Sequence, residues 1–220
     1  WWRPEQFLRK KPFLERRAGS RLLNGQVVLL LGYGAIGRRV VELLAPFQMK
    51  IYAVRRKTYS EPGVHIIPED RLSSVIASAD HVVNVLPEND STLNYVNARR
   101  LGWCKRGARF FNVGRGSTVD QNALVEALAS GRLASAYLDV TEPEPLPPSH
   151  PLWSAPNCYI TPHSAGGRHD QDEALAVSSL AAKVFCSEGV VWVADEAVQL
   201  HGALGFIEDT GLALVLRDVR

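Results

Sequence analysis

The sequence predicts an α/β fold, with a doubly wound parallel sheet and a helical C-terminal tail. Three observations support this prediction. Segments typical of strands and helices alternate along the chain, as they do when each parallel strand is followed by a crossover helix. The first strand, residues 27–31, is a continuous apolar run, which suits a strand buried on both faces. A glycine-rich turn follows it and leads directly into an amphipathic helix.

The glycine-rich turn has the form Gly-x-Gly-x-x-Gly. Its first glycine lets the chain leave the strand tightly, the second lets a pyrophosphate approach, and the third lets the helix pack on the strand. The N-terminus of the helix presents free N–H groups to phosphate oxygens. We therefore predict a dinucleotide at this turn, and the alternative is a tight turn without a ligand. The residues predicted to lie around the cofactor here are Gly32, Gly34, Ala35, Ile36 and Gly37.

Apolar periodicity and turn residues predict the other elements. After the first helix, strands are expected at 49–54, 81–86, 108–113, 134–140 and 158–161, and helices at 69–79, within 90–101, at 120–130 and at 170–185. Pro62-Gly63 breaks the chain after the second strand, and Gly131 ends the 120–130 helix. The segment 143–151 contains five prolines, so we expect an extended loop there.

Composition excludes several classes of function. The 220 residues carry a net charge of +2, which gives no broad electrostatic footprint for nucleic acid. The three cysteines lack the spacing of a metal site, and an odd count does not make a disulfide framework. The apolar runs are too short for a membrane span, and the N-terminus does not resemble a secretory signal. These features predict a cytoplasmic protein without metal, nucleic-acid or membrane partners.

Two arginines end the second strand. Arg55 lies eighteen residues after Gly37, and Arg56 follows it. An acidic residue at this point would accept a hydrogen bond from the ribose 2′-hydroxyl of NAD, whereas arginine would pair with a 2′-phosphate. The sequence therefore predicts a preference for NADP, with NAD as the alternative cofactor. A solvated basic turn is the interpretation without a ligand.

Three further segments carry polar residues at the ends of later strands. Arg115 lies between two glycines and could bind a carboxylate through both of its terminal nitrogens. Asp139 ends a strand before an acidic, proline-rich segment, and His163 follows another strand as a possible general acid. Each alone could be an ordinary surface residue. Because the carboxyl ends of parallel strands meet at one edge, together they predict an enzyme site.

The segments LGYGAIG, NVGRGSTVD, LDVTEPEPLPPSHPLW and TPHSAGG together resemble the nucleotide-binding domain of the D-isomer-specific 2-hydroxyacid dehydrogenases, a Rossmann fold. The resemblance is closest to the NADP-preferring glyoxylate and hydroxypyruvate reductases. It implies that Arg115 binds the carboxylate of a 2-oxo acid and that His163 gives a proton to its carbonyl. Glu144 would hold and tune His163, with Glu142 as the alternative by motif position, and Asp139 would contact the nicotinamide side.

The same resemblance implies a wider cofactor site and a homodimer. The small-molecule partner would be a 2-oxo or 2-hydroxy acid. Beyond the glycine turn and the two arginines, the residues expected at the cofactor are Leu86, Pro87, Thr92, Val113, Gly114, Arg115, Asp139, His163, Ala165 and Gly166.

Two departures from the family pattern divide the chain. Residues 1–186 match the cofactor domain, but the substrate domain that precedes it in the family is not expected in this chain. Residues 187–220 differ in character, and 191–220 resemble the C-terminal end of acyl-CoA dehydrogenases, where a similar segment helps to hold FAD. Only about thirty residues match, so FAD binding is not expected. The alternative function is a non-catalytic dinucleotide-binding or dimerisation module.

Overall fold

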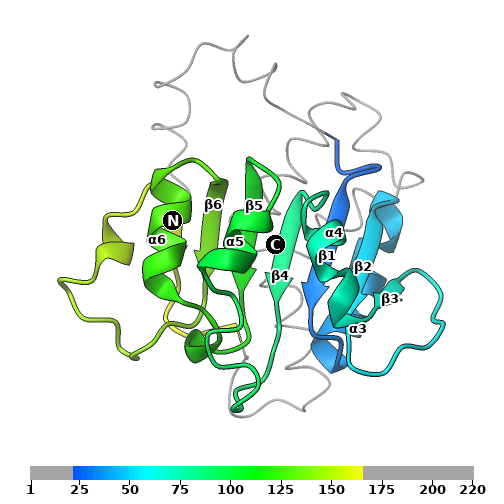
Figure 1. The fold of residues 1–220 in the computed structure, drawn as a ribbon, viewed down its shortest axis with the longest axis horizontal. Coiled ribbons are helices and arrows are strands. Elements are labelled where there is room, and N and C mark those ends of the chain that lie inside the picture. Colours follow the sequence, from blue (N-terminus) through cyan, green and yellow to red (C-terminus); the bar gives the residue numbers. More distant parts are fainter. Residues whose placement is uncertain (1–21, 166–220) are drawn as a thin grey trace, which may run out of the picture.

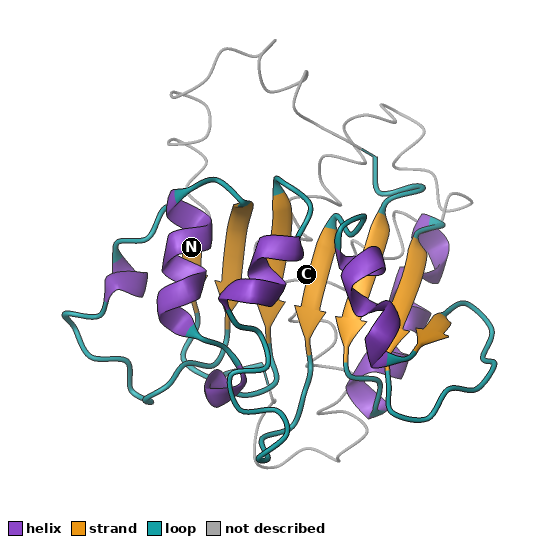
Figure 2. Cartoon of the chain, in the orientation of Figure 1, coloured by secondary structure: helices purple, strands orange, loops and turns teal. Residues whose placement is uncertain are grey.

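The computed structural model describes residues 22–165, which form a seven-stranded, entirely parallel sheet with helices on both faces (Figures 1 and 2). The strand order β3-β2-β1-β4-β5-β6-β7 places β1 near the centre, with the chain winding outward in both directions. This confirms the predicted doubly wound fold. The strands are β1 (Val27–Leu31), β2 (Lys50–Val54), β3 (His65–Ile67), β4 (His81–Asn84), β5 (Ala108–Asn112), β6 (Leu133–Leu138) and β7 (Cys158–Ile160).

Helices cover the sheet unequally. Helix α3 (Ala35–Leu44) packs on one face, and three helices lie on the other, in front of the strands in Figure 2. These three are α4 (Leu72–Ile76), α5 (Ala98–Trp103) and α6 (Gln121–Ala129). Short 3₁₀ turns complete the described part: η1 (Ala45–Phe47), η2 (Glu69–Arg71), η3 (Gly116–Thr118) and η4 (Pro151–Trp153).

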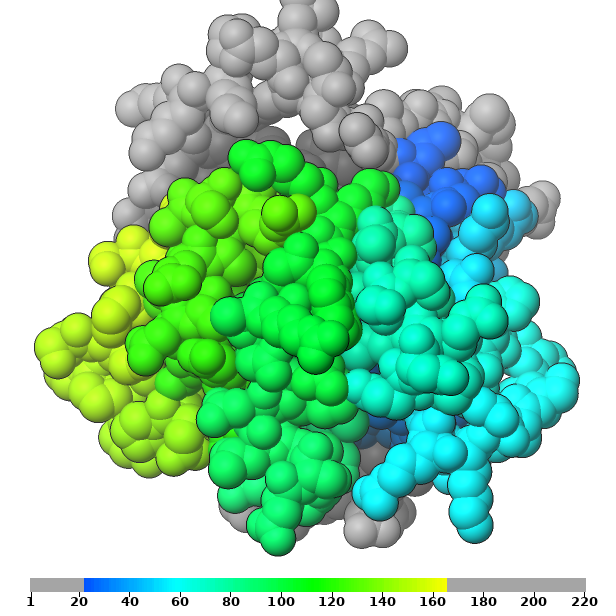
Figure 3. Space-filling view, viewed as in Figure 1, coloured from blue at the N-terminus to red at the C-terminus, as the bar shows by residue number. Residues whose placement is uncertain are grey.

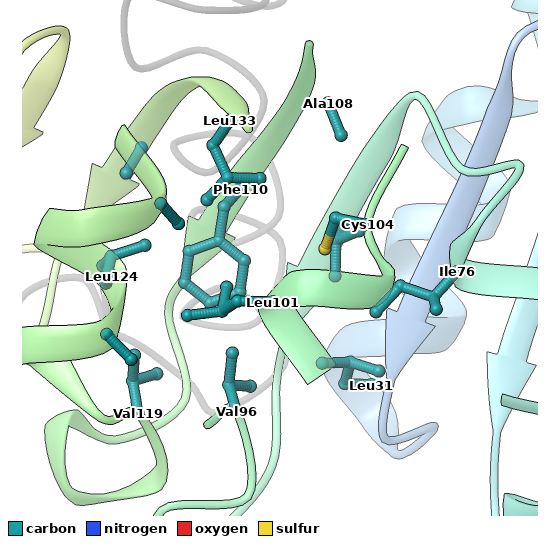
Figure 4. Packing of buried hydrophobic residues seen from close by; sticks show 14 of the residues in the cluster. Leu31, Ile76, Val96, Leu101, Cys104, Ala108, Phe110, Val119, Leu124 and Leu133 are labelled. Atoms are coloured by element: carbon teal, nitrogen blue, oxygen red, sulfur yellow. The ribbon is translucent and has the colours of Figure 1, made fainter. Parts of the chain in front are cut away.

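Alternate residues of each strand feed two separate cores, because successive strand side chains point to opposite faces. In β1, Leu29 and Leu31 belong to the core under α4–α6, whereas Val28 and Leu30 belong to the core under α3. Phe110 lies at the centre of the first core, between α5 and α6 (Figure 4). On this face, side chains close over the sheet in the space-filling view (Figure 3).

Most predicted elements are confirmed, but the boundaries differ where polar side chains compete with the helical backbone. The predicted 69–79 helix is shortened to η2 and α4, and the Ser78 hydroxyl bonds the carbonyl of Val75 just after α4. In the predicted 90–101 region, turns precede α5, which begins after Asn97 caps it by accepting from the Arg100 N–H. The short edge strand β3 was not predicted, because three residues are too few to establish a period.

Within residues 22–165, none of the helices has the length and apolar character needed to cross a membrane. The same residues contain no group of three or more His, Cys, Asp or Glu side chains that could hold a metal ion.

A buried histidine gives a testable pH dependence. His81 bonds Gln26 Oε1 through Nε2 at 2.8 Å, and burial, followed by the charge of Arg109, lowers the pKa of His81 from 6.5 to about 4. The unfolded chain therefore binds a proton that the folded chain excludes as the pH falls below 6.5. We expect this histidine to lower the free energy of unfolding by roughly 3 kcal/mol between pH 6.5 and 4, with no effect above that window.

Denaturant unfolding of the wild type and of His81→Gln across this pH range measures that contribution. The difference in the free energy of unfolding between the two proteins should become smaller as the pH falls, because only the wild type carries the titrating group. If the free energies of unfolding of the two proteins change in parallel from pH 7 to pH 4, the fold does not keep His81 neutral.

Candidate active site

The carboxyl ends of the strands lie along one edge of the sheet, the lower edge of Figure 1. The loops that leave this edge carry the residues singled out in the sequence. In an open parallel sheet, ligands bind outside this edge, where the strand order reverses. Here the reversal lies between β1 and β4, which are neighbours although two strands separate them in sequence.

The glycine turn after β1 has the geometry of a phosphate-binding loop. Gly32 has a φ of +95°, and a Cβ atom on it would lie 3.3 Å from the Leu86 side chain. Gly34 is the N-cap of α3, without a side-chain cap, and open space lies where its Cβ would be. Because the first turn of α3 holds no acidic residue, its backbone N–H groups, at Ala35 and Ile36, suit a phosphate.

Gly37 and the loop after β4 complete this part of the site. A Cβ on Gly37 would lie 3.0 Å from Tyr33 Cδ2, so the helix packs closely on the turn. Beyond β4, the Thr92 hydroxyl donates to the Pro87 carbonyl at 2.6 Å and fixes the loop that begins at Leu86. The predicted cofactor residues of these two segments therefore lie next to each other, because the Leu86 side chain lies directly against Gly32.

His163 and Glu144 form the centre of the site. His163 Nδ1 lies 2.8 Å from Glu144 Oε2, although the two residues are nineteen positions apart in the sequence. Glu144 Oε1 accepts from the Thr141 N–H at 3.0 Å. Partial burial acts to raise the pKa of the Glu144 carboxyl, but the hydrogen bonds from His163 and Thr141, with the charges of His163 and Arg115, hold it below its ordinary value. The pair therefore presents an ionised carboxylate to the imidazole.

The structure distinguishes between the two candidate glutamates. The backbone of Glu142 bonds the side chain of Gln121, with the Glu142 N–H donating to Oε1 at 3.1 Å and its carbonyl accepting from Nε2. The carboxylate that meets His163 is that of Glu144.

Asp139 holds the segment that carries His163. Its buried carboxylate accepts from the Thr161 hydroxyl at 2.5 Å and from the N–H groups of Ser164 and Ala165 at 3.0 and 2.9 Å. The Asp139 carbonyl also accepts from the His163 N–H at 2.9 Å. His163 has a φ of +49°, a conformation that costs energy in a non-glycine residue and persists only where its surroundings enforce it.

The backbone carbonyl of Arg115 accepts hydrogen bonds from a buried polar network that was not predicted from the sequence. At the ends of β4 and β5, Asn84 Nδ2 donates to Asn112 Oδ1 at 2.9 Å and to Thr118 Oγ1 at 2.7 Å. Asn112 Nδ2 and the Thr118 hydroxyl both donate to the Arg115 carbonyl, at 3.1 and 2.6 Å. The Arg115 side chain is exposed, and its Nη1 donates to the Gly114 carbonyl at 2.7 Å.

The same network also holds the loops that carry three of the predicted cofactor residues, Leu86, Val113 and Gly114. Asn112 Oδ1 accepts from the Gly114 N–H, Asn84 Oδ1 accepts from the Leu86 N–H, and the Val113 N–H donates to the Asn84 carbonyl. The sequence signal that could have found the network is the pair of asparagines ending two strongly apolar strands, since a buried amide there needs partners.

Arg55 and Arg56 are far from His163 in the sequence, but they follow β2 at the same edge of the sheet. Arg55 Nη1 donates to the Tyr59 hydroxyl at 2.7 Å, and its guanidinium lies 5.0 Å from the centre of that ring. Arg56 is exposed. Tyr59 was not predicted from the sequence. Gly166, the predicted helix at 170–185 and the tail at 187–220 lie outside the described residues.

Two family profiles match the chain. The profile "D-isomer specific 2-hydroxyacid dehydrogenase, NAD binding domain" covers residues 3–165. The profile "Acyl-CoA dehydrogenase, C-terminal domain" covers residues 161–220, in agreement with the resemblance of the tail.

Individual known proteins are also similar to this chain in sequence and in structure. A glyoxylate reductase from Aeropyrum pernix is 35% identical over 170 residues, which are 77% of this chain and 51% of that protein. A D-isomer-specific 2-hydroxyacid dehydrogenase from Xanthobacter autotrophicus, solved with NADPH and MES, is 33% identical with a TM-score of 0.67, over 85% of this chain and 81% of that one.

An NADPH-dependent glyoxylate/hydroxypyruvate reductase from Sinorhizobium meliloti is 31% identical with a TM-score of 0.61, over 65% of this chain and 74% of that one. The chain spans about half the length of the curated relatives it matches.

Proposed function

We propose that this chain, which belongs to the D-isomer-specific 2-hydroxyacid dehydrogenases, uses NADPH to reduce a small 2-oxo acid of the glyoxylate or hydroxypyruvate type to a D-2-hydroxy acid. The observation that carries the proposal is the contact of 2.8 Å between His163 and Glu144. Arg115, the cation proposed for the substrate, follows β5 at the same edge of the sheet.

Each side chain has a defined part in this reaction. The Arg115 guanidinium binds the substrate carboxylate and leaves the carbonyl facing His163. His163 donates its Nε2 proton to the carbonyl oxygen as negative charge develops there. Glu144 accepts a hydrogen bond from His163 Nδ1, which fixes the orientation of the ring, so that the proton given to the substrate is the one on Nε2.

NADPH fits the first turn of α3 and the end of β2. The uncapped helix terminus at Gly34 would take the pyrophosphate, and Arg55 would take the 2′-phosphate. When bound, NADPH supplies the hydride. The oriented His163 supports catalysis over a module that only binds a dinucleotide, because dinucleotide binding alone does not need a paired acid at this edge.

The test of the proposal is the rate of NADPH oxidation with glyoxylate and with hydroxypyruvate, followed at the NADPH absorption band. We expect oxidation with both acids. Tight NADPH binding without oxidation would instead favour the non-catalytic module. The homodimer and the cytoplasmic location stay predictions.

Cofactor preference gives a second prediction. We expect NADPH to bind more tightly than NADH, and Arg55→Asp to remove about 1.5–3 kcal/mol of NADPH binding by deleting a charge-assisted phosphate contact. Titration of both cofactors against both proteins measures this change.

The matched control is Arg106→Asp, which makes the same charge change in the loop before β5, at the opposite edge of the sheet. It should leave both affinities unaltered. Equal affinities of the wild type for NADPH and NADH would contradict the proposed preference.

A further inference from the structure

Two guanidinium groups from different elements converge on one oxygen atom. Arg55 at the end of β2 donates to the Tyr59 hydroxyl at 2.7 Å, and Arg38 in α3 donates to the same oxygen at 3.1 Å. Tyr59 lies in the loop between β2 and β3, which protrudes at the lower right of the space-filling view (Figure 3). Arg38 was not among the cofactor residues predicted from the sequence.

This arrangement concentrates positive charge around a neutral acceptor. A phenol oxygen accepts two hydrogen bonds but does not compensate two cations. Among residues 22–165, the carboxylate that lies against these arginines is that of Glu61, whose Oε1 lies 3.8 Å from Arg38 Nε. Burial, followed by a hydrogen bond to Glu61, raises the pKa of Tyr33, so this second phenol is neutral too. One carboxylate at this distance leaves the pair of guanidiniums with an excess of positive charge.

We infer that Arg38 and Arg55 together bind the 2′-phosphate of NADPH, with the Tyr59 hydroxyl lying at the phosphate and Glu61 competing for Arg38. The inference rests on the proposed use of NADPH and assigns a second cation and an opposing carboxylate to its phosphate site. A phosphate that is close to a dianion matches two guanidiniums, each of which offers several donors.

The position of Arg38 favours the 2′-phosphate over the pyrophosphate. Arg38 is the fourth residue of α3, beyond the terminal N–H groups that suit the pyrophosphate. Its Nη2 is directed to the oxygen that Arg55 also contacts, and Arg55 lies where the 2′ substituent of the ribose is read in this fold. The two arginines therefore meet at the Tyr59 hydroxyl, which is the place proposed for the 2′-phosphate.

Glu61 is expected to weaken the binding of a phosphate at this site. Its carboxylate pairs with Arg38 in the structure described here, and it would repel a phosphate placed between the arginines. Neutralising Glu61 should release Arg38 and strengthen phosphate binding. An increase in affinity is a sharp test, because a variant that merely folds poorly loses affinity.

The experiment compares the binding of 2′,5′-ADP and 5′-AMP by isothermal titration calorimetry, since these two probes differ by the 2′-phosphate alone. The proteins are the full chain, R38Q, R55Q and E61Q. The control is R39Q, the same change at the neighbouring position of α3, where the guanidinium pairs with Glu42 at 2.8 Å.

We expect R38Q to weaken 2′,5′-ADP by about 10- to 100-fold, the range of a charge-assisted contact, and to leave 5′-AMP unaltered. E61Q should tighten 2′,5′-ADP by about threefold or more, and R39Q should match the wild type. If the wild type binds both probes equally, the proposed NADPH preference fails, and this inference fails with it. If R55Q abolishes the difference and R38Q retains it, the NADPH preference stands and the role of Arg38 is refuted.

Discussion

Replacing His163 by glutamine is expected to lower kcat for NADPH-dependent glyoxylate reduction by about 10²- to 10⁴-fold, the usual contribution of a positioned general acid. The amide keeps a similar shape but has no proton of suitable acidity to give to the carbonyl. The Kd for NADPH should change by less than about threefold, since the phosphate contacts assigned to the glycine turn and Arg55 remain in place.

The control for this variant is His65→Gln, the same substitution at an exposed histidine in β3. Its rate should equal that of the wild type. A His163→Gln protein with more than a tenth of the wild-type kcat would show that the proton comes from another group. Glu144→Gln should lower kcat with a smaller effect, because the imidazole is retained and loses its charged partner.

Replacing Asp139 by alanine is expected to have the second largest effect. The Asp139 carboxylate accepts from the Thr161 hydroxyl and from the N–H groups of Ser164 and Ala165. Without it these donors, two of them on the backbone, lose their acceptor next to the left-handed conformation of His163. We expect the free energy of unfolding to fall by about 2–4 kcal/mol, of which about 1–3 kcal/mol comes from the buried Ala165 N–H that loses its acceptor.

Denaturant unfolding and kcat measure this effect together. Asp139→Ala should lose both stability and rate, whereas Asp70→Ala, at an exposed aspartate in η2, should leave both unaltered. Unchanged stability would show that the Thr161–Ala165 segment does not depend on this carboxylate. The contact of Asp139 with the nicotinamide side stays a prediction; within the protein, its carboxylate accepts from Thr161, Ser164 and Ala165.

The parts of the fold that sequence predicts well are those set by local pattern. The apolar run of β1 and the glycine turn define the first strand and helix, because both patterns lie within consecutive residues of the sequence. The His163–Glu144 contact was also predicted, since both residues follow strands that end at one edge. Because all the strands are parallel, their carboxyl ends lie at one edge of the sheet, whatever the conformation of the loops that connect them.

Features that depend on contacts between distant segments were missed. Asn84, Asn112 and Thr118 form hydrogen bonds across three segments, and the asparagines that end two apolar strands do not reveal which partners they have. The meeting of Arg38 and Tyr59 depends on the course of the loop between β2 and β3. That course is stabilised by the short strand β3, which is too brief to be detected from periodicity.

In the proposed reaction, this chain transfers a hydride from NADPH to a 2-oxo acid with the help of His163. The most direct test is a single-turnover experiment, with the protein in excess over NADPH and hydroxypyruvate added last. We predict that the NADPH absorbance falls completely, that one D-glycerate forms for each NADPH, and that His163→Gln slows the fall by about 10²-fold or more. If the chain binds NADPH to saturation and its absorbance stays unchanged, the chain does not catalyse this reduction.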